Sequence, residues 1–129
     1  MKKIINIVLR ILLSLLLVMP ILGVLGVFPA PTRDLYQTQE AYDFIITLTN
    51  SGYIMWMMAA VFAICLILTF KNKMAAVALL LLPITLNIVG FHAFLDGGLF
   101  TSGSIMAVAF FLINLYFLWE NHNRYKVLF

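Results

Sequence analysis

The fold of this chain is decided by one long apolar segment, residues 74–96, which reads MAAVALLLLPITLNIVGFHAFLD. As a helix, such a run is long enough to cross the roughly 30 Å hydrocarbon core of a bilayer. Its last part carries an amide, an imidazole and a carboxylate, from Asn87, His92 and Asp96. Polar groups at membrane depth are costly, and their presence marks the segment as the first place to search for a function.

The composition indicates that lipid is the solvent of this protein. Of its 129 residues 64% are apolar and only 10% are charged, whereas a soluble domain carries about 25% charged residues. No cluster of Lys and Arg is interleaved with aromatic residues, which argues against nucleic acid as a partner. The sequence has no nucleophile–His–acid set, CxxC pair or phosphate loop, so it does not indicate a self-contained enzyme and leaves catalysis open.

The hydropathy pattern predicts an all-α integral membrane protein, a four-helix antiparallel bundle in a single domain. We expect membrane spans at 4–28, 53–70, 74–95 and 101–119, followed by a polar tail at 120–129. The first run exceeds the roughly 7–15 apolar residues of a signal peptide, which predicts a retained helix. Residues 38–49 place apolar side chains at helical spacing behind a capping Thr38, which predicts a short amphipathic helix at the membrane interface.

The charges predict an orientation. Arg33 lies in the first connection, and the other seven of the eight basic residues fall on the opposite side of the four-span arrangement: Lys2, Lys3, Arg10, Lys71, Lys73, Arg124 and Lys126. The positive-inside rule makes the side with seven cytoplasmic. We therefore expect a multi-pass protein of the bacterial cytoplasmic (inner) membrane with both termini in the cytoplasm.

Several motifs resemble the DoxX family of small four-span membrane proteins. They are Arg10, Gly52-Tyr53, Asn87-Ile88, the segment Phe91 to Asp96, Asn114-Leu115-Tyr116 with Trp119, Arg124-Tyr125 and Leu128-Phe129. The family includes a subunit linked to thiosulfate:quinone oxidoreduction. The resemblance therefore implies a redox-associated role, quinone as the possible cofactor and a redox partner subunit. Relatives often carry a Lys and a Glu in the second helix, whereas residues 55–62 here, MWMMAAVF, contain no ionisable group.

His92 and Asp96 are spaced four residues apart and should share a helix face. One interpretation is an oriented imidazole in a ligand site; the other is a structural pair that closes the turn before Gly97. Asn87 lies one to two turns deeper, and we expect it within the bundle, either as an interhelical hydrogen-bonding residue or as a contact to a quinone carbonyl. Together with Trp56 and Tyr53, these three residues form the predicted ligand site.

Other polar residues are assigned structural roles. Arg10 is expected to pair with Glu120 at the matching end of the fourth helix, and Asn114 to bond between helices. Met55, Met57 and Met58 reach the depth of His92, but adjacent methionines on a helix point in different directions. They are predicted to pack in the core, and no metal site is predicted.

The sequence is consistent with three hypotheses for function. The first is a DoxX-like subunit or accessory component of a membrane redox system with a quinone-sized pocket beside His92. The second is a non-catalytic scaffold, assembly or stress-related protein with a solid core in that place. The third is a small transporter, which requires an oligomer because four short helices enclose little volume.

Overall fold

The computed structural model describes residues 1–129, and the chain is helical throughout with no strand. Its five α-helices are α1 (Lys2–Val24), α2 (Gln39–Ser51), α3 (Tyr53–Phe70), α4 (Met74–Phe94) and α5 (Ile105–Glu120). Three short 3-10 helices are η1 (Arg33–Leu35), η2 (Ser102–Ser104) and η3 (His122–Leu128). Four helical stretches are long and apolar enough to cross a membrane, namely α1, α3, α4 and residues 102–120. The prediction of an all-helical chain with four such stretches is therefore confirmed.

The first helix is shorter than predicted, because it ends at Val24 and not at residue 28. Gly26 takes a positive φ of 84°, and the amide of Val27 donates to the carbonyl of Leu22 at 3.0 Å. This pair of features is a Schellman motif, which closes a helix by satisfying its last carbonyls. The apolar residues after it, up to Phe28, belong to the connection that leads to α2.

The fourth apolar stretch and the tail also differ from the predicted bounds. The α-helix α5 begins at Ile105, after η2. Ser104 is buried, and its hydroxyl donates to the carbonyls of Leu99 and Thr101, at 2.8 Å each. The polar tail forms η3, where the Tyr125 hydroxyl donates to the carbonyl of Ala75 at 2.8 Å and holds the tail against α4.

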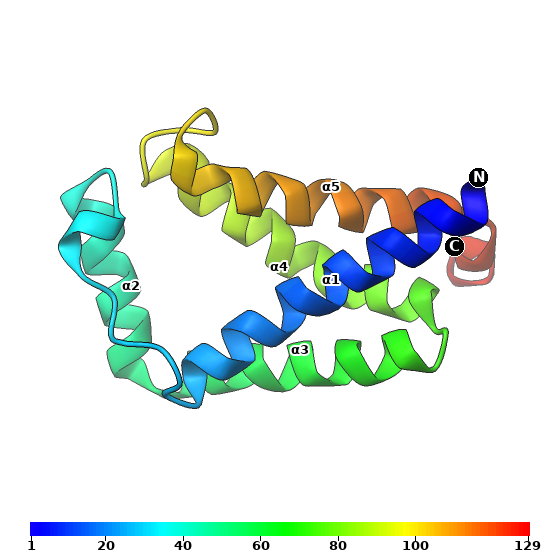
Figure 1. Cartoon of the computed structure of the whole chain (residues 1–129), viewed down its shortest axis with the longest axis horizontal. Helices are drawn as coiled ribbons and strands as arrows, with labels where there is room; N and C mark the ends of the chain where they lie inside the picture. The colour runs from blue at the N-terminus through cyan, green and yellow to red at the C-terminus, as the bar shows by residue number, and fades with distance from the viewer.

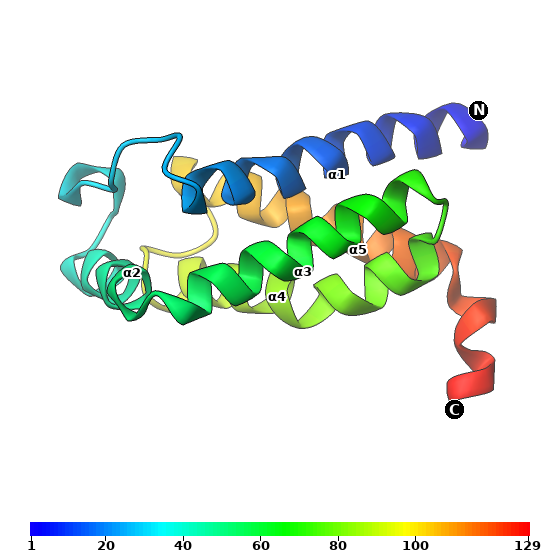
Figure 2. The ribbon, with the colours of Figure 1, turned by 90° about the horizontal axis from the view of Figure 1, so that it is seen from below.

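The arrangement of the helices places two groups of connections at opposite ends of the molecule (Figures 1 and 2). Both termini and the α3–α4 turn lie at one end, whereas α2 and the α4–α5 connection lie at the other. α4 packs along α5, and α1 packs along α3. α2 lies across the end of the molecule, at a steep angle to the long helices (Figure 1).

The core is small and apolar. It joins residues of all four long helices: Leu13, Leu17, Phe62, Cys65, Met74, Val77, Ala78, Leu81, Phe110, Ile113 and Phe117. Only 19 of 129 residues are buried, and large apolar side chains cover much of the outer surface. A soluble protein rarely exposes such continuous apolar surface. Together with the four candidate spans, this surface indicates a multi-pass membrane protein.

Candidate functional site

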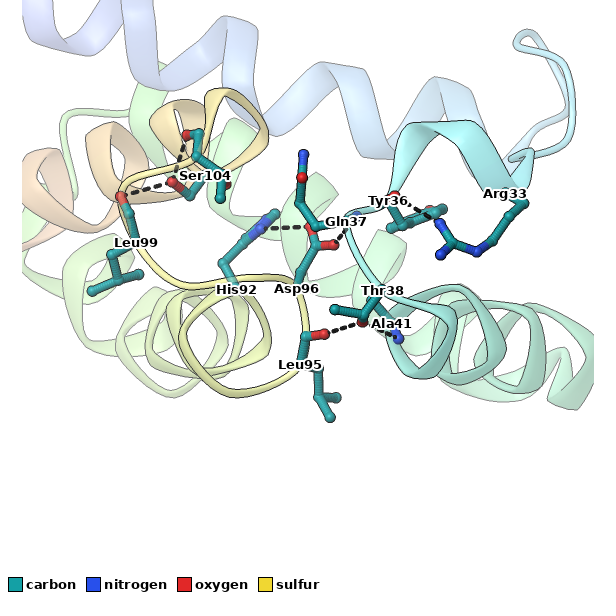
Figure 3. Close-up of polar contacts among 11 residues, drawn as sticks. Arg33, Tyr36, Gln37, Thr38, Ala41, His92, Leu95, Asp96, Leu99 and Ser104 are labelled. Carbon is teal, nitrogen blue, oxygen red and sulfur yellow. Dashed lines mark hydrogen bonds and ion pairs between the residues drawn. The ribbon is translucent and has the colours of Figure 1, made fainter.

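A polar strap joins the end of α4 to the connection that precedes α2 (Figure 3). Asp96 is only 2% exposed, and its Oδ1 accepts a hydrogen bond from the backbone amide of Gln37 at 2.7 Å. The hydroxyl of Thr38 donates to the carbonyl of Leu95 and accepts from the amide of Ala41 at 3.1 Å. Thr38 is thus confirmed as the N-cap of α2, and the same side chain fastens α2 to α4.

His92 stands on the other side of the Asp96 carboxylate, as its spacing of four residues predicts. Its Nδ1 lies 3.1 Å from Oδ2 of Asp96, which confirms that the two residues are neighbours. The ring nitrogen makes no well-aligned hydrogen bond, so the contact is mainly electrostatic. Because Nδ1 faces the carboxylate, Nε2 is the ring nitrogen left for a ligand.

Tyr36 extends the site on the connection side. Its ring packs edge-on to Phe91, with centroids 6.3 Å apart, and lies 6.0 Å from the ring of Tyr42. Burial raises the pKa of the Tyr36 phenol above its ordinary value, and the negative charge of Asp96 raises it further. The phenol therefore stays protonated over a wider pH range than a free tyrosine and is available as a hydrogen-bond donor.

Beside this strap lies a crevice of about 690 Å³. α1, α2, α3, α4 and the connection all contribute to its lining, which comprises Pro20, Tyr36, Phe44, Ile45, Leu48, Ile54, Met55, Met58, Phe62, Pro83, Ile84, Asn87, Ile88, Phe91 and His92. Most of these side chains are apolar, and the few polar groups include the Asn87 amide and the His92 imidazole. The volume and this mixture are typical of a small-molecule site, in which a few polar groups orient an otherwise apolar ligand.

The position of Asn87 corrects one prediction. Asn87 is exposed on the crevice side of α4 and makes no side-chain hydrogen bond within the protein, so it does not join helices. Asn114 is the buried amide, at 1% exposure, and its Nδ2 donates to the carbonyl of Ala78 at 3.1 Å. Thr85 approaches the Asn114 oxygen at 3.5 Å. Asn114 is therefore confirmed as the interhelical polar contact.

The two predicted aromatic members lie apart from His92. Trp56 is 56% exposed and lines a neighbouring hollow of about 460 Å³, beneath residues 28–31 of the connection. Tyr53 is 64% exposed and lines neither space. Both occupy the first turn of α3, which also carries the crevice-lining Met55, and Met58 follows in the next turn. The phenyl and phenol rings at the crevice are those of Tyr36, Phe44, Phe62 and Phe91, which no local spacing relates to one another.

At the opposite end of the molecule, the predicted Arg10–Glu120 pair is wrong. A guanidinium nitrogen of Arg10 donates to the side-chain oxygen of Asn72 in the α3–α4 turn. Glu120 accepts instead from the amide of Asn6 at 2.5 Å, and the Asn6 oxygen accepts from the Tyr116 hydroxyl at 2.5 Å. Asn6 lies one turn before Arg10, so it, and not Arg10, reaches the end of α5.

Comparisons of the chain with protein-family models, with curated proteins and with solved structures give no match. The Asn87 amide can donate a hydrogen bond to a carbonyl oxygen, and so can Nε2 of His92 when it carries a proton. The surrounding apolar side chains can contact a flat ring or an alkyl chain.

Proposed function

We propose that this chain is a DoxX-like protein of the bacterial cytoplasmic membrane, folded as an antiparallel four-helix bundle with α2 at the outer interface. The charge distribution supports this topology: seven of the eight basic residues belong to the end that holds both termini and the α3–α4 turn (Figure 1). The positive-inside rule assigns that end to the cytoplasm. The exposed rings of Tyr53 and Trp56 near α2 are typical of an interfacial aromatic belt.

We further propose that the 690 Å³ crevice binds a quinone, and that the protein serves a membrane redox system as a quinone-binding subunit or accessory component. One observation carries this proposal: an apolar crevice of that size lies directly beside Asn87 and His92. A quinone combines an apolar ring and tail with two carbonyl acceptors, which is the complement of this lining. In this role the protein would bind and orient the quinone for a partner subunit.

Each polar side chain has a separate role in the proposal. The Asn87 amide has no competing protein partner, so its Nδ2 is free to donate to one quinone carbonyl. His92 donates from Nε2 in its imidazolium form, in which both ring nitrogens carry a proton and Nδ1 faces the Asp96 carboxylate. Asp96 is a positioning residue, since it is buried behind His92 and does not line the crevice.

The test is binding of decylubiquinone to the purified protein in lipid nanodiscs. Quenching of Trp56 fluorescence, in a Trp119→Phe background, reports occupancy of the neighbouring space. We expect His92→Phe to raise Kd by about tenfold, the effect of losing one hydrogen bond worth about 1.4 kcal/mol. The chain has two histidines, so His122→Phe at the other end is the matched control and should leave Kd unchanged.

Mass spectrometry of the protein purified with native lipid gives an independent readout. A co-purifying quinone, lost in the Asn87→Leu variant, would support the proposal. Saturable decylubiquinone binding that is equal in wild type, His92→Phe and Asn87→Leu would place the quinone elsewhere. Failure of wild type to bind decylubiquinone would overturn the proposal and favour the scaffold hypothesis.

A further inference from the structure

The crevice communicates with two smaller hollows, and each is a possible way in. A shallow hollow of about 220 Å³ lies between α2 and α4, and shares Phe44, Asn87 and Phe91 with the crevice. The second, of about 460 Å³, lies beneath residues 28–31 and shares Pro20, Tyr36, Ile45, Met55 and Met58 with it. The two hollows share no lining residue with each other, so they adjoin the crevice at different places.

The α2–α4 hollow is framed by one stripe of α4. Asn87, Gly90, Phe91 and Phe94 all line it, and their spacing of three, four and seven residues places them on one helix face. A Cβ atom added at Gly90 would meet no heavy atom within 4 Å, so this face has an open gap one turn above Asn87. Phe94 is 89% exposed, and in the proposed topology it contacts lipid beside the gap.

Two stacked rings separate this hollow from the crevice. The ring centroids of Phe44 and Phe91 lie 5.8 Å apart, with their planes inclined by 28°. The two residues come from different helices, and Phe44 is 38% exposed at the edge of α2. A rotation of the Phe44 side chain would therefore widen the passage from the hollow into the crevice without moving a helix.

The polar strap borders the end of the crevice at which Tyr36 and His92 lie. The connection that carries Tyr36 is fastened to the end of α4 by the bond from the Gln37 amide to Asp96, at 2.7 Å, and by the bond from Thr38 to Leu95 (Figure 3). Asp96 is almost fully buried in this contact. A ligand that entered at this end would have to break these bonds, whereas a ligand that entered through the α2–α4 hollow meets a lining in which Asn87 is the one polar residue.

We infer that the crevice takes its ligand laterally from the bilayer, through the gap between α2 and α4, with Phe44 and Phe91 as the gate. The inference rests on the proposed function and narrows its ligand to molecules that partition into the membrane. Asn87 belongs both to the hollow and to the crevice. It is therefore the first polar group that an incoming carbonyl meets, before His92.

Two glycines offer a matched test, because each lines one of the hollows. Gly90 lines the α2–α4 hollow, and Gly23 lines the hollow beneath residues 28–31, where an added Cβ would make an ordinary contact of 3.9 Å with Phe28. Both glycines lie in helices, with no positive φ. Stopped-flow quenching of Trp56 measures the association and dissociation rates of decylubiquinone in nanodiscs that hold the Trp119→Phe protein.

We expect Gly90→Leu to narrow the path and to slow association and dissociation by the same factor, so that Kd changes little. An entry barrier raised by about 1.4 kcal/mol slows each rate by about tenfold. Gly23→Leu should leave both rates unchanged. Phe44→Ala should accelerate both rates, and it provides the decisive measurement if Gly90→Leu does not fold. Slowing by Gly23→Leu alone, or rates that neither Gly90→Leu nor Phe44→Ala alters, would overturn the lateral path. Absence of binding to wild type would instead overturn the proposed quinone site itself.

Discussion

Removal of the Asp96 carboxylate should release the strap that holds α2 against the end of α4. The carboxylate is 2% exposed and contacts two groups from different parts of the chain. Its Oδ1 accepts from the Gln37 amide at 2.7 Å, and its Oδ2 lies 3.1 Å from Nδ1 of His92. Asp96→Ala therefore leaves a part-buried backbone amide without its acceptor and removes the carboxylate that faces His92.

The magnitude follows from these two contacts. A hydrogen bond to a charged acceptor contributes about 1.5–3 kcal/mol, and the poorly aligned ion pair adds at most about 1 kcal/mol. Asp96→Ala should therefore lower the free energy of unfolding by about 1.5–4 kcal/mol. Asp96→Asn keeps an acceptor for Gln37 and loses only the charge, so it should cost about 1–2 kcal/mol.

The assay is unfolding by sodium dodecyl sulfate in mixed micelles, followed by circular dichroism. Asp43→Ala is the matched control, because Asp43 is an exposed carboxylate in α2 that accepts only from Gln39, at 2.9 Å, and should cost about 0.2–0.5 kcal/mol. Hydrogen exchange of the Gln37 amide gives a local readout and should accelerate in Asp96→Ala. The reasoning is refuted if Asp96→Ala is no less stable than Asp43→Ala and the Gln37 amide exchanges at the wild-type rate.

Three further predictions concern other parts of the same end and of the core. Asn114→Ala should lower the free energy of unfolding by about 1 kcal/mol in detergent unfolding, because it removes a buried interhelical hydrogen bond. In the same assay Asn87→Ala should leave the free energy of unfolding nearly unchanged, because Asn87 is exposed and bonds to no other helix. Gly97→Ala should lower the free energy of unfolding more than Gly98→Ala in the same assay. Both glycines have positive φ, but only at Gly97 would an added Cβ be crowded, at 3.0 Å from the Cβ of Gln37. The pKa of Tyr36 is raised in the folded state, so above the ordinary tyrosine value of 10.0 the unfolded chain loses this proton first and the free energy of unfolding should fall as pH rises. Melting curves over a range of alkaline pH should show a weaker fall for Tyr36→Phe.

Local features of the fold could be predicted well from sequence. The start and end of α3 agree with the predicted 53–70, and α4 begins at Met74 as expected. The Thr38 cap and the His92–Asp96 contact were also predictable, because both depend on residues three or four positions apart. The early end of α1 could have been found from Gly26, since glycine is the usual residue at a helix C-terminus that needs positive φ.

Which residues make up the candidate site was harder to predict from the sequence. α3 and α4 are apolar on all sides, so their sequences carry little information about which face is turned inward. For this reason Asn87 was expected inside the bundle, although the structure buries Asn114 and turns Asn87 toward the crevice. The contributions of Tyr36 and Phe44 were not predicted, because both reach the site from the α1–α2 connection and α2.

Composition and hydropathy were sufficient to predict that this chain is a membrane protein, that it is helical and where its four long apolar segments lie. Those properties follow from composition and from contacts within one or two helical turns. Only the tertiary structure decided that Gln37 meets Asp96, 59 residues away, and that Asn6, not Arg10, meets Glu120, 114 residues away. Contacts between such distant residues depend on how far each helix is rotated about its own axis and on the angle at which it crosses its neighbours. A helix that is apolar on all sides has no pattern of apolar and polar residues from which this rotation could be predicted.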